Sequence, residues 1–241
     1  MAHGVFGEFM GTLVLILLGN GVVANVLLKK TKGEAAGWMV ITTGWGLAVM
    51  AGVFTAMACG SEGQLNPAVT LGAAIVSGDF SNVGGYIAAQ LAGAFVGACL
   101  VWLHYLPHWR ETPEHDLKFS CFATSPAIRS PLANFLSEVI GTFLLVLVAD
   151  AIFSKAVAAN GPVAGLGPWL VGSLVWGIGL GLGGTTGYAI NPARDLGPRI
   201  AHAILPIPNK GGSDWNYSAI PLLGPLVGGT LAGLFARFAH F

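Results

Sequence analysis

Long apolar stretches alternate with short polar segments along the whole chain of 241 residues. Six of these stretches approach or exceed the length of about 20 apolar residues that a membrane-spanning helix needs. They cover about residues 7–28, 38–58, 83–105, 134–153, 168–183 and 219–238, and the fifth is short and rich in glycine. The pattern therefore predicts an all-α membrane protein with six transmembrane helices.

Two further apolar segments are too short to span a bilayer, and each begins at the tripeptide Asn-Pro-Ala. The tripeptides consist of Asn66, Pro67 and Ala68, and of Asn191, Pro192 and Ala193. Asn at a helix cap accepts hydrogen bonds from backbone N–H groups, and Pro at the first helical position removes only a donor that lacks a partner anyway. Each tripeptide therefore predicts a re-entrant half-helix. We expect the positive dipole ends of the two half-helices to face each other across a passage inside the membrane.

The two halves of the chain resemble each other. The segment around Glu8 (GEFMGT) matches the segment around Glu138 (SEVIGT), 130 positions later (138 minus 8), and similar offsets relate other pairs. A duplicated unit with three spans must enter the membrane from opposite sides, which makes an inverted repeat with its ligand path near the midplane. We expect one channel domain over residues 1–241, with repeat one at about 1–106, a polar linking loop at about 107–131 and repeat two at about 132–241.

Composition supports this picture and excludes several classes of function. The chain is 54% hydrophobic and only 9% charged, against about 25% charged residues in a soluble domain. Its net charge is zero, which gives no basis for nucleic-acid binding. The sequence shows no cysteine or histidine spacing typical of a metal site and no nucleophile–base pair, so we expect neither an enzyme nor a bound cofactor or metal.

The distribution of basic residues bears on the orientation of the chain in the membrane. Six spans place both termini on one side, but nine of the eleven Lys and Arg residues fall in loops of the other side. The nine are Lys29, Lys30, Lys32, Arg110, Lys118, Arg129, Arg194, Arg199 and Lys210. By the positive-inside tendency alone, the termini would lie outside the cell.

Taken together, these residues resemble a known family. The paired Asn-Pro-Ala boxes, Glu8 and Glu138 at the start of each repeat, the three-plus-three duplication and Arg194 after the second box resemble the major intrinsic proteins, which are the aquaporins and glycerol facilitators. The resemblance covers almost the whole chain. It implies a homotetramer with one pore per subunit, in the plasma membrane, with both termini in the cytoplasm. We follow this implication over the count of basic residues.

The resemblance also implies a selectivity filter. In this family the narrowest point is formed by the Arg of the second box and three other residues. The matching residues in this chain are Arg194, Trp45, Gly179 and Tyr188. Water-selective members tend to carry a His where Gly179 stands, and Asp195 after Arg194 resembles the glycerol-conducting branch. Tyr188 departs from the Phe that is common in glycerol facilitators.

These residues favour a passive channel that conducts glycerol, other small neutral polyols and some water. The channel would exclude ions and protons. Trp45 and Tyr188 would form an apolar corner opposite the N–H donors of Arg194. Asn66 and Asn191 would offer amide donors at the midplane. Because Tyr188 adds a hydroxyl, a water-selective pore or a pore for small protonated organic acids remains an alternative. Gln64, where a His often precedes the first box, is a second departure.

A different class, the ion-coupled secondary transporter, remains a third hypothesis. It requires a titratable or ion-binding group in the middle of the membrane. The acidic residues of the spans, Glu8, Glu138 and Asp150, lie near span ends, which argues against it. We expect Glu8 and Glu138 to be buried acceptors that brace the re-entrant loops rather than proton carriers, and Asp195 to complement its own helix start or a loop.

Overall fold

The computed structural model describes residues 2–157 and 159–240, and within them every regular element is a helix. The long helices are α1 (Ala2–Leu27), α2 (Trp38–Ala58), α4 (Val83–His104), α7 (Pro131–Phe153), α8 (Leu166–Leu182) and α10 (Ala219–Ala239). The short helices are α3 (Pro67–Ser77), α5 (His108–Glu111), α6 (His115–Ser120) and α9 (Pro192–Ile204). Five long helices are apolar and have at least 21 residues. The sixth, α8, has 17 residues, which is at the lower limit for a span.

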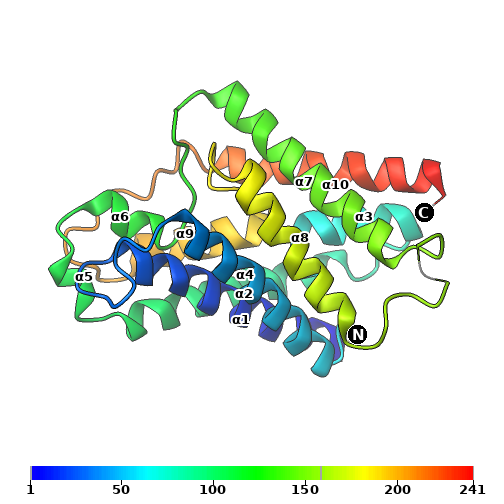
Figure 1. Ribbon diagram of the computed structural model, residues 1–241, viewed down its shortest axis with the longest axis horizontal. Coiled ribbons are helices and arrows are strands. Elements are labelled where there is room, and N and C mark those ends of the chain that lie inside the picture. The colour runs from blue at the N-terminus through cyan, green and yellow to red at the C-terminus, as the bar shows by residue number, and fades with distance from the viewer. Residues whose placement is uncertain (1, 158, 241) are drawn as a thin grey trace.

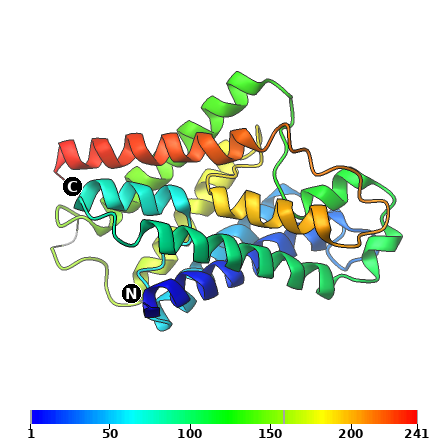
Figure 2. The same ribbon diagram turned by 180° about the vertical axis from the view of Figure 1, so that it is seen from behind.

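The six long helices form a bundle that encloses α3 and α9 (Figures 1 and 2). Both termini lie at one end of the bundle, and α5 and α6 lie at the opposite end. In Figure 2, α3 and α9 come from opposite ends and meet near the centre, and residues of the two helices are in contact. This is the arrangement predicted for two re-entrant half-helices.

The packing of the helices repeats between the two halves. In the first half, α1 packs against α2 and α4, and in the second half α7 packs against α8 and α10. Each half-helix packs against the other repeat, since α3 contacts α10 and α9 contacts α4. Exchanging the halves therefore maps each of these pairs onto another, as an inverted repeat requires.

Small residues allow the long helices to approach closely. A Cβ atom on Gly97 of α4 would lie 2.7 Å from the carbonyl oxygen of Leu13 in α1, and one on Gly228 of α10 would lie 2.5 Å from that of Val139 in α7. Both glycines belong to small-xxx-small spacings, with Gly93 and Gly224 one turn earlier. Such contacts bring helix backbones together where lipid supplies no hydrophobic driving force.

The linking segment differs from the loop that its polar composition predicts. It contains α5 and α6, and it folds back so that Trp109 and Phe122 are almost completely buried. Phe119 and Phe122 both pack edge-on against the ring of His202 in α9. Lys118 is buried as well and donates to the carbonyl oxygen of Pro208, and burial lowers the pKa of its ammonium group. The aromatic side chains of the linking segment therefore anchor this segment over the second half-helix, α9.

Candidate solute pathway

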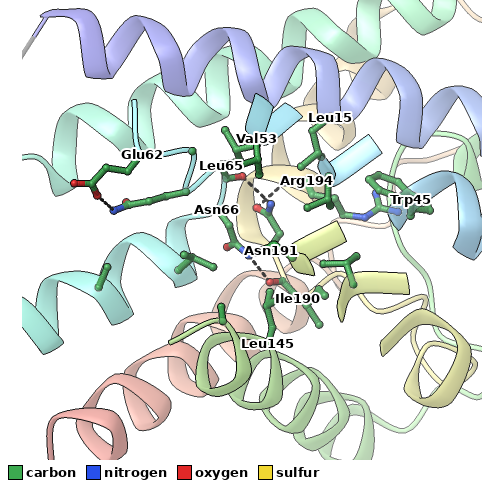
Figure 3. A pocket seen from close by; sticks show the side chains of 18 of the residues that line it. Leu15, Trp45, Val53, Glu62, Leu65, Asn66, Leu145, Ile190, Asn191 and Arg194 are labelled. Atoms are coloured by element: carbon green, nitrogen blue, oxygen red, sulfur yellow. Dashed lines mark hydrogen bonds between the residues drawn. The ribbon is translucent and has the colours of Figure 1, made fainter. Parts of the chain in front are cut away.

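A cavity of about 340 Å³ lies at the centre of the bundle. Figure 3 shows it extending from Glu62 at one end, past Asn66 and Asn191, to Arg194 and Trp45 at the other end. This volume is far above the roughly 10–15 Å³ that a single water requires, so the cavity has room for several waters or a small solute. Its walls are mostly aliphatic, and polar groups are concentrated at the centre and at the two ends. A mostly apolar passage with a few polar groups suits a small uncharged solute.

The centre of the cavity is formed by the starts of the two half-helices. The Asn66 side chain accepts from the N–H of Ala68, and the Asn191 side chain accepts from the N–H of Ala193. The dipoles of α3 and α9 therefore point their positive ends, each worth roughly +0.5 charge, at the same place.

The two asparagines also hold each other's loops (Figure 3). Asn66 Nδ2 donates to the carbonyl oxygen of Ile190 at 2.7 Å, and Asn191 Nδ2 donates to that of Leu65 at 2.9 Å. An amide nitrogen carries two hydrogens, so each asparagine keeps one N–H after making this bond. Leu65 and Ile190 adopt positive φ angles of 56° and 42°, which are uncommon for residues with a Cβ. The cross-linked loops hold this backbone in place.

Glu8 of α1 lies behind the first loop and is completely buried. One carboxylate oxygen accepts from Ser61 Oγ at 2.5 Å and from the N–H of Gln64 at 2.9 Å. The other accepts from the N–H of Leu65 at 2.6 Å and from Gln90 Nε2 at 2.7 Å. All four contacts hold the loop or its neighbours, so the carboxylate is placed to brace the loop.

Glu138 of α7 has the corresponding position behind the second loop, and its side chain is 1% exposed. It accepts from the N–H of Ala189 at 3.0 Å and from that of Ile190 at 2.8 Å. Neither Glu8 nor Glu138 lines the cavity. This geometry matches the bracing role expected for both residues and gives neither of them direct access to a solute.

Arg194, Trp45 and Tyr188 meet at one end of the cavity and all line it. Arg194 Nη1 donates to the carbonyl oxygen of Phe122 at 3.3 Å, and the guanidinium carbon lies 4.1 Å from the centre of the Trp45 ring. We expected Arg194 to face Trp45 across the passage, but the two side chains are stacked in contact, which is a favourable cation–π arrangement. Because both side chains line the cavity, N–H donors and an aromatic ring lie side by side in its wall.

Tyr188 forms another part of the wall. Its hydroxyl is buried and has no hydrogen-bond partner among the described residues. Its φ is 37°, and Gly187 before it also has a positive φ of 78°. The chain therefore turns sharply here, and the turn directs the ring into the cavity wall.

Gly179 does not line the cavity, although the resemblance implies that it belongs to the filter. It lies behind Tyr188: a Cβ atom at this position would be 2.8 Å from Tyr188 Cζ and 2.9 Å from its hydroxyl oxygen. The Gly179 carbonyl oxygen accepts from Trp38 Nε1 at 3.1 Å. The contact with the Tyr188 ring gives Gly179 a route by which it can influence the passage.

Asp195 faces the linker and not the cavity. Its carboxylate pairs with Arg199 at 2.7 Å and accepts from the N–H and the hydroxyl of Thr124 at 2.8 and 2.6 Å. It thus complements its own helix start and a loop. Phe122 and Thr124, which orient Arg194 and Asp195, were not predicted as site residues. The short apolar run from 121 to 123 within the polar linker, with Phe119 just before it, was the signal that this segment is buried.

Two independent comparisons agree with the geometry. The profile of the family described as "Major intrinsic protein" matches residues 1–236. The chain belongs to the major intrinsic protein family. The solved "aquaglyceroporin from Plasmodium falciparum" superposes with a TM-score of 0.85 at 32% identity, covering 98% of this chain and 95% of that one. The predicted fold, with six spans and two re-entrant half-helices, is thereby confirmed.

Several curated relatives are similar over nearly their full length. A "Probable glycerol uptake facilitator protein" of Thermotoga maritima is 57% identical over 93% of this chain and 94% of its own. A "Glycerol uptake facilitator protein" of Streptococcus pneumoniae is 53% identical over 97% and 98%, and that of Bacillus subtilis is 51% identical over 97% and 84%. Membership of this family places the chain among membrane channels rather than enzymes. Within the described residues, no group of three or more His, Cys, Asp or Glu side chains is placed to hold a metal ion.

Proposed function

We propose that this member of the major intrinsic protein family is a passive channel for glycerol and related small neutral polyols, with some passage of water. The observation that carries the proposal is the mixed surface at one end of the cavity. There the guanidinium donors of Arg194 lie directly beside the aromatic surfaces of Trp45 and Tyr188. A polyol has a carbon side and a hydroxyl side, so it fits both surfaces at once. The names of the relatives at 51–57% identity support the same class of solute.

In the proposed mechanism, a solute exchanges hydrogen bonds to water for a series of weak hydrogen bonds to the channel. Arg194 supplies donors at one end, and the remaining N–H of Asn66 and of Asn191 supplies donors at the centre. Each contact is weak enough to release the solute. Cations are opposed by the positive ends of α3 and α9 and by Arg194. A water at the centre accepts from both asparagines, which interrupts a chain of proton-carrying waters.

We also propose a homotetramer in the plasma membrane with both termini in the cytoplasm. The number of basic residues at the opposite end of the bundle argues against this orientation, because loops rich in Lys and Arg tend to lie in the cytoplasm. Several of them have structural partners: Lys118 is buried against a carbonyl group, Arg199 pairs with Asp195, and Lys210 donates to the last carbonyl groups of α9. We therefore give more weight to the resemblance of the whole fold, which implies cytoplasmic termini.

A panel of solutes in stopped-flow light scattering tests the proposal. Proteoliposomes carrying the wild-type protein are shrunk in glycerol, in a small organic acid near its pKa or in an impermeant sugar, and water permeability is measured separately. We expect reswelling in glycerol well above that of protein-free vesicles. Water flux without glycerol flux would favour the water-selective alternative. Accumulation of solute driven by a pH gradient would instead indicate a coupled transporter.

A further inference from the structure

The end of the cavity opposite Arg194 contains acidic and amide groups that the proposed mechanism does not use. We call this end the vestibule and define its polar lining as Glu62, Gln64 and Asp150. Its other walls are apolar and include Val53, Val69, Ala73 and Phe153. Among the described residues that line the cavity, the one cationic side chain is Arg194, at the far end.

Asp150 lies beyond the asparagine pair, towards the end of the cavity opposite Arg194. A Cβ atom on Gly141 of α7 would touch Ile190 at 3.0 Å, which places Gly141 level with the asparagine pair. Asp150 follows nine residues later (150 minus 141), about 13 Å along the helix axis. Val171, near the start of α8, lines the same region, whereas Gly179, near the other end of α8, lies against Tyr188. Asp150 and Arg194 therefore belong to opposite ends of the cavity.

Two of the residues that line the vestibule each have an oxygen atom without a partner. Asp150 Oδ2 and Gln64 Oε1 are both buried and accept no hydrogen bond from the described residues. Gln64 uses its amide group to donate to Glu62 at 3.2 Å, so its carbonyl oxygen is the group left free. A buried acceptor without a donor is costly. Gln64 also keeps one N–H after its bond to Glu62, but the carboxylates of Glu62 and Asp150 can only accept when ionised. The polar lining of the vestibule therefore has more acceptors than donors and favours an occupant that donates hydrogen bonds.

We propose that Asp150, with Gln64 as a second acceptor, forms a hydroxyl-binding site where a small polyol is held before it reaches the asparagine pair. This inference rests on the proposed function. Water also donates hydrogen bonds, but a polyol carries several hydroxyl groups on one skeleton. Once one hydroxyl is bound, another hydroxyl of the same molecule has a high effective concentration at a second acceptor of the vestibule. The apolar walls accommodate the carbon chain, so the site favours polyols over water and raises their concentration at this mouth of the passage.

The test compares two variants of Asp150 in the full-length protein reconstituted in liposomes. Asp150→Ala removes the acceptor and widens the vestibule, and Asp150→Asn keeps the shape with a neutral, weaker acceptor. For Asp150→Ala we expect the ratio of glycerol to water permeability to fall about fivefold, the effect of losing roughly one hydrogen bond. For Asp150→Asn we expect a ratio of glycerol to water permeability between that of Asp150→Ala and that of the wild type. Asp79→Asn is the matched control, because Asp79 is an exposed carboxylate in the turn after α3, outside the cavity.

The possible results lead to separate conclusions. A fall in the ratio for both Asp150 variants, with the Asp79 control unchanged, supports the binding site. If glycerol and water permeability stay unchanged, water alone hydrates the carboxylate and the inference is wrong. Equal losses of both permeabilities show a purely structural role and also overturn it. A rise in glycerol flux in Asp150→Ala shows that the vestibule acts only by its width. Absence of glycerol flux in the wild type would overturn the proposed function itself.

Discussion

Replacing Gly179 by Ala should narrow the passage without placing any atom in it. The new Cβ would lie 2.8 Å from Tyr188 Cζ, whereas carbon atoms in contact prefer about 3.5–4.0 Å. The ring must therefore move by about 1 Å away from α8, and because Tyr188 lines the cavity, this motion reduces the space for a solute. Overpacking by one methyl group typically strains a packed structure by about 1–3 kcal/mol, and we take an energy of this order as the added barrier for glycerol. We expect glycerol permeability to fall roughly tenfold, since about 1.4 kcal/mol corresponds to a factor of ten.

Stopped-flow light scattering on proteoliposomes measures this effect, with water permeability determined in the same preparations. Water is smaller than glycerol and should be affected less. Gly177→Ala is the matched control on the same helix, because a Cβ at Gly177 meets no atom within 4 Å. Adding Tyr188→Leu to Gly179→Ala should restore part of the glycerol flux. The reasoning is refuted if Gly179→Ala behaves like Gly177→Ala, or if it lowers glycerol and water flux by the same factor.

Three further substitutions test the supports of the site. Glu138→Gln leaves one oxygen for two loop N–H donors, so the protein should lose about 2 kcal/mol of stability, seen as a lower apparent unfolding temperature in detergent; an unchanged temperature would contradict bracing. Asp195→Asn leaves the buried Arg199 without its charge partner and should lower the free energy of unfolding by about 3–5 kcal/mol. Asp214→Asn, at a partly exposed ion pair, is the control and should lower it by less than about 1 kcal/mol. Similar losses for both variants would show that burial of the pair is unimportant. Asn191→Ala removes a helix cap and the bond to Leu65 and should cost at least about 1 kcal/mol in the same unfolding assay; no loss would mean that the cross-linked loops do not stabilise the fold.

The helices could be predicted closely because their signals are local. Apolar length and the Asn-Pro starts depend on neighbouring residues, and α2 begins and ends where the apolar pattern does, at Trp38 and Ala58. The differences lie at helix ends: α7 begins at Pro131, three residues earlier than expected, because Pro suits the first helical position. Element boundaries are decided by such end effects rather than by the apolar pattern.

The details of the site could not be predicted, because they depend on residues far apart in the chain. The bond from Asn66 to the Ile190 carbonyl spans 124 positions, and the linker that holds Arg194 looked polar as a whole. The contact between Gly179 and Tyr188 and the stack of Arg194 on Trp45 depend on tertiary packing. Asp150 looked like an ordinary residue near the end of a span, and only the shape of the cavity shows that it faces the pathway.

The central claim is that small polyols cross the membrane passively between the two half-helices and past Arg194. The most direct measurement is the reswelling rate of proteoliposomes in a glycerol gradient, recorded together with membrane conductance and without any ion or pH gradient. The account predicts fast reswelling in glycerol, none in an impermeant sugar and no added conductance. Vesicles that reswell in glycerol no faster than protein-free vesicles, or that do so only when an ion gradient is applied, would contradict it.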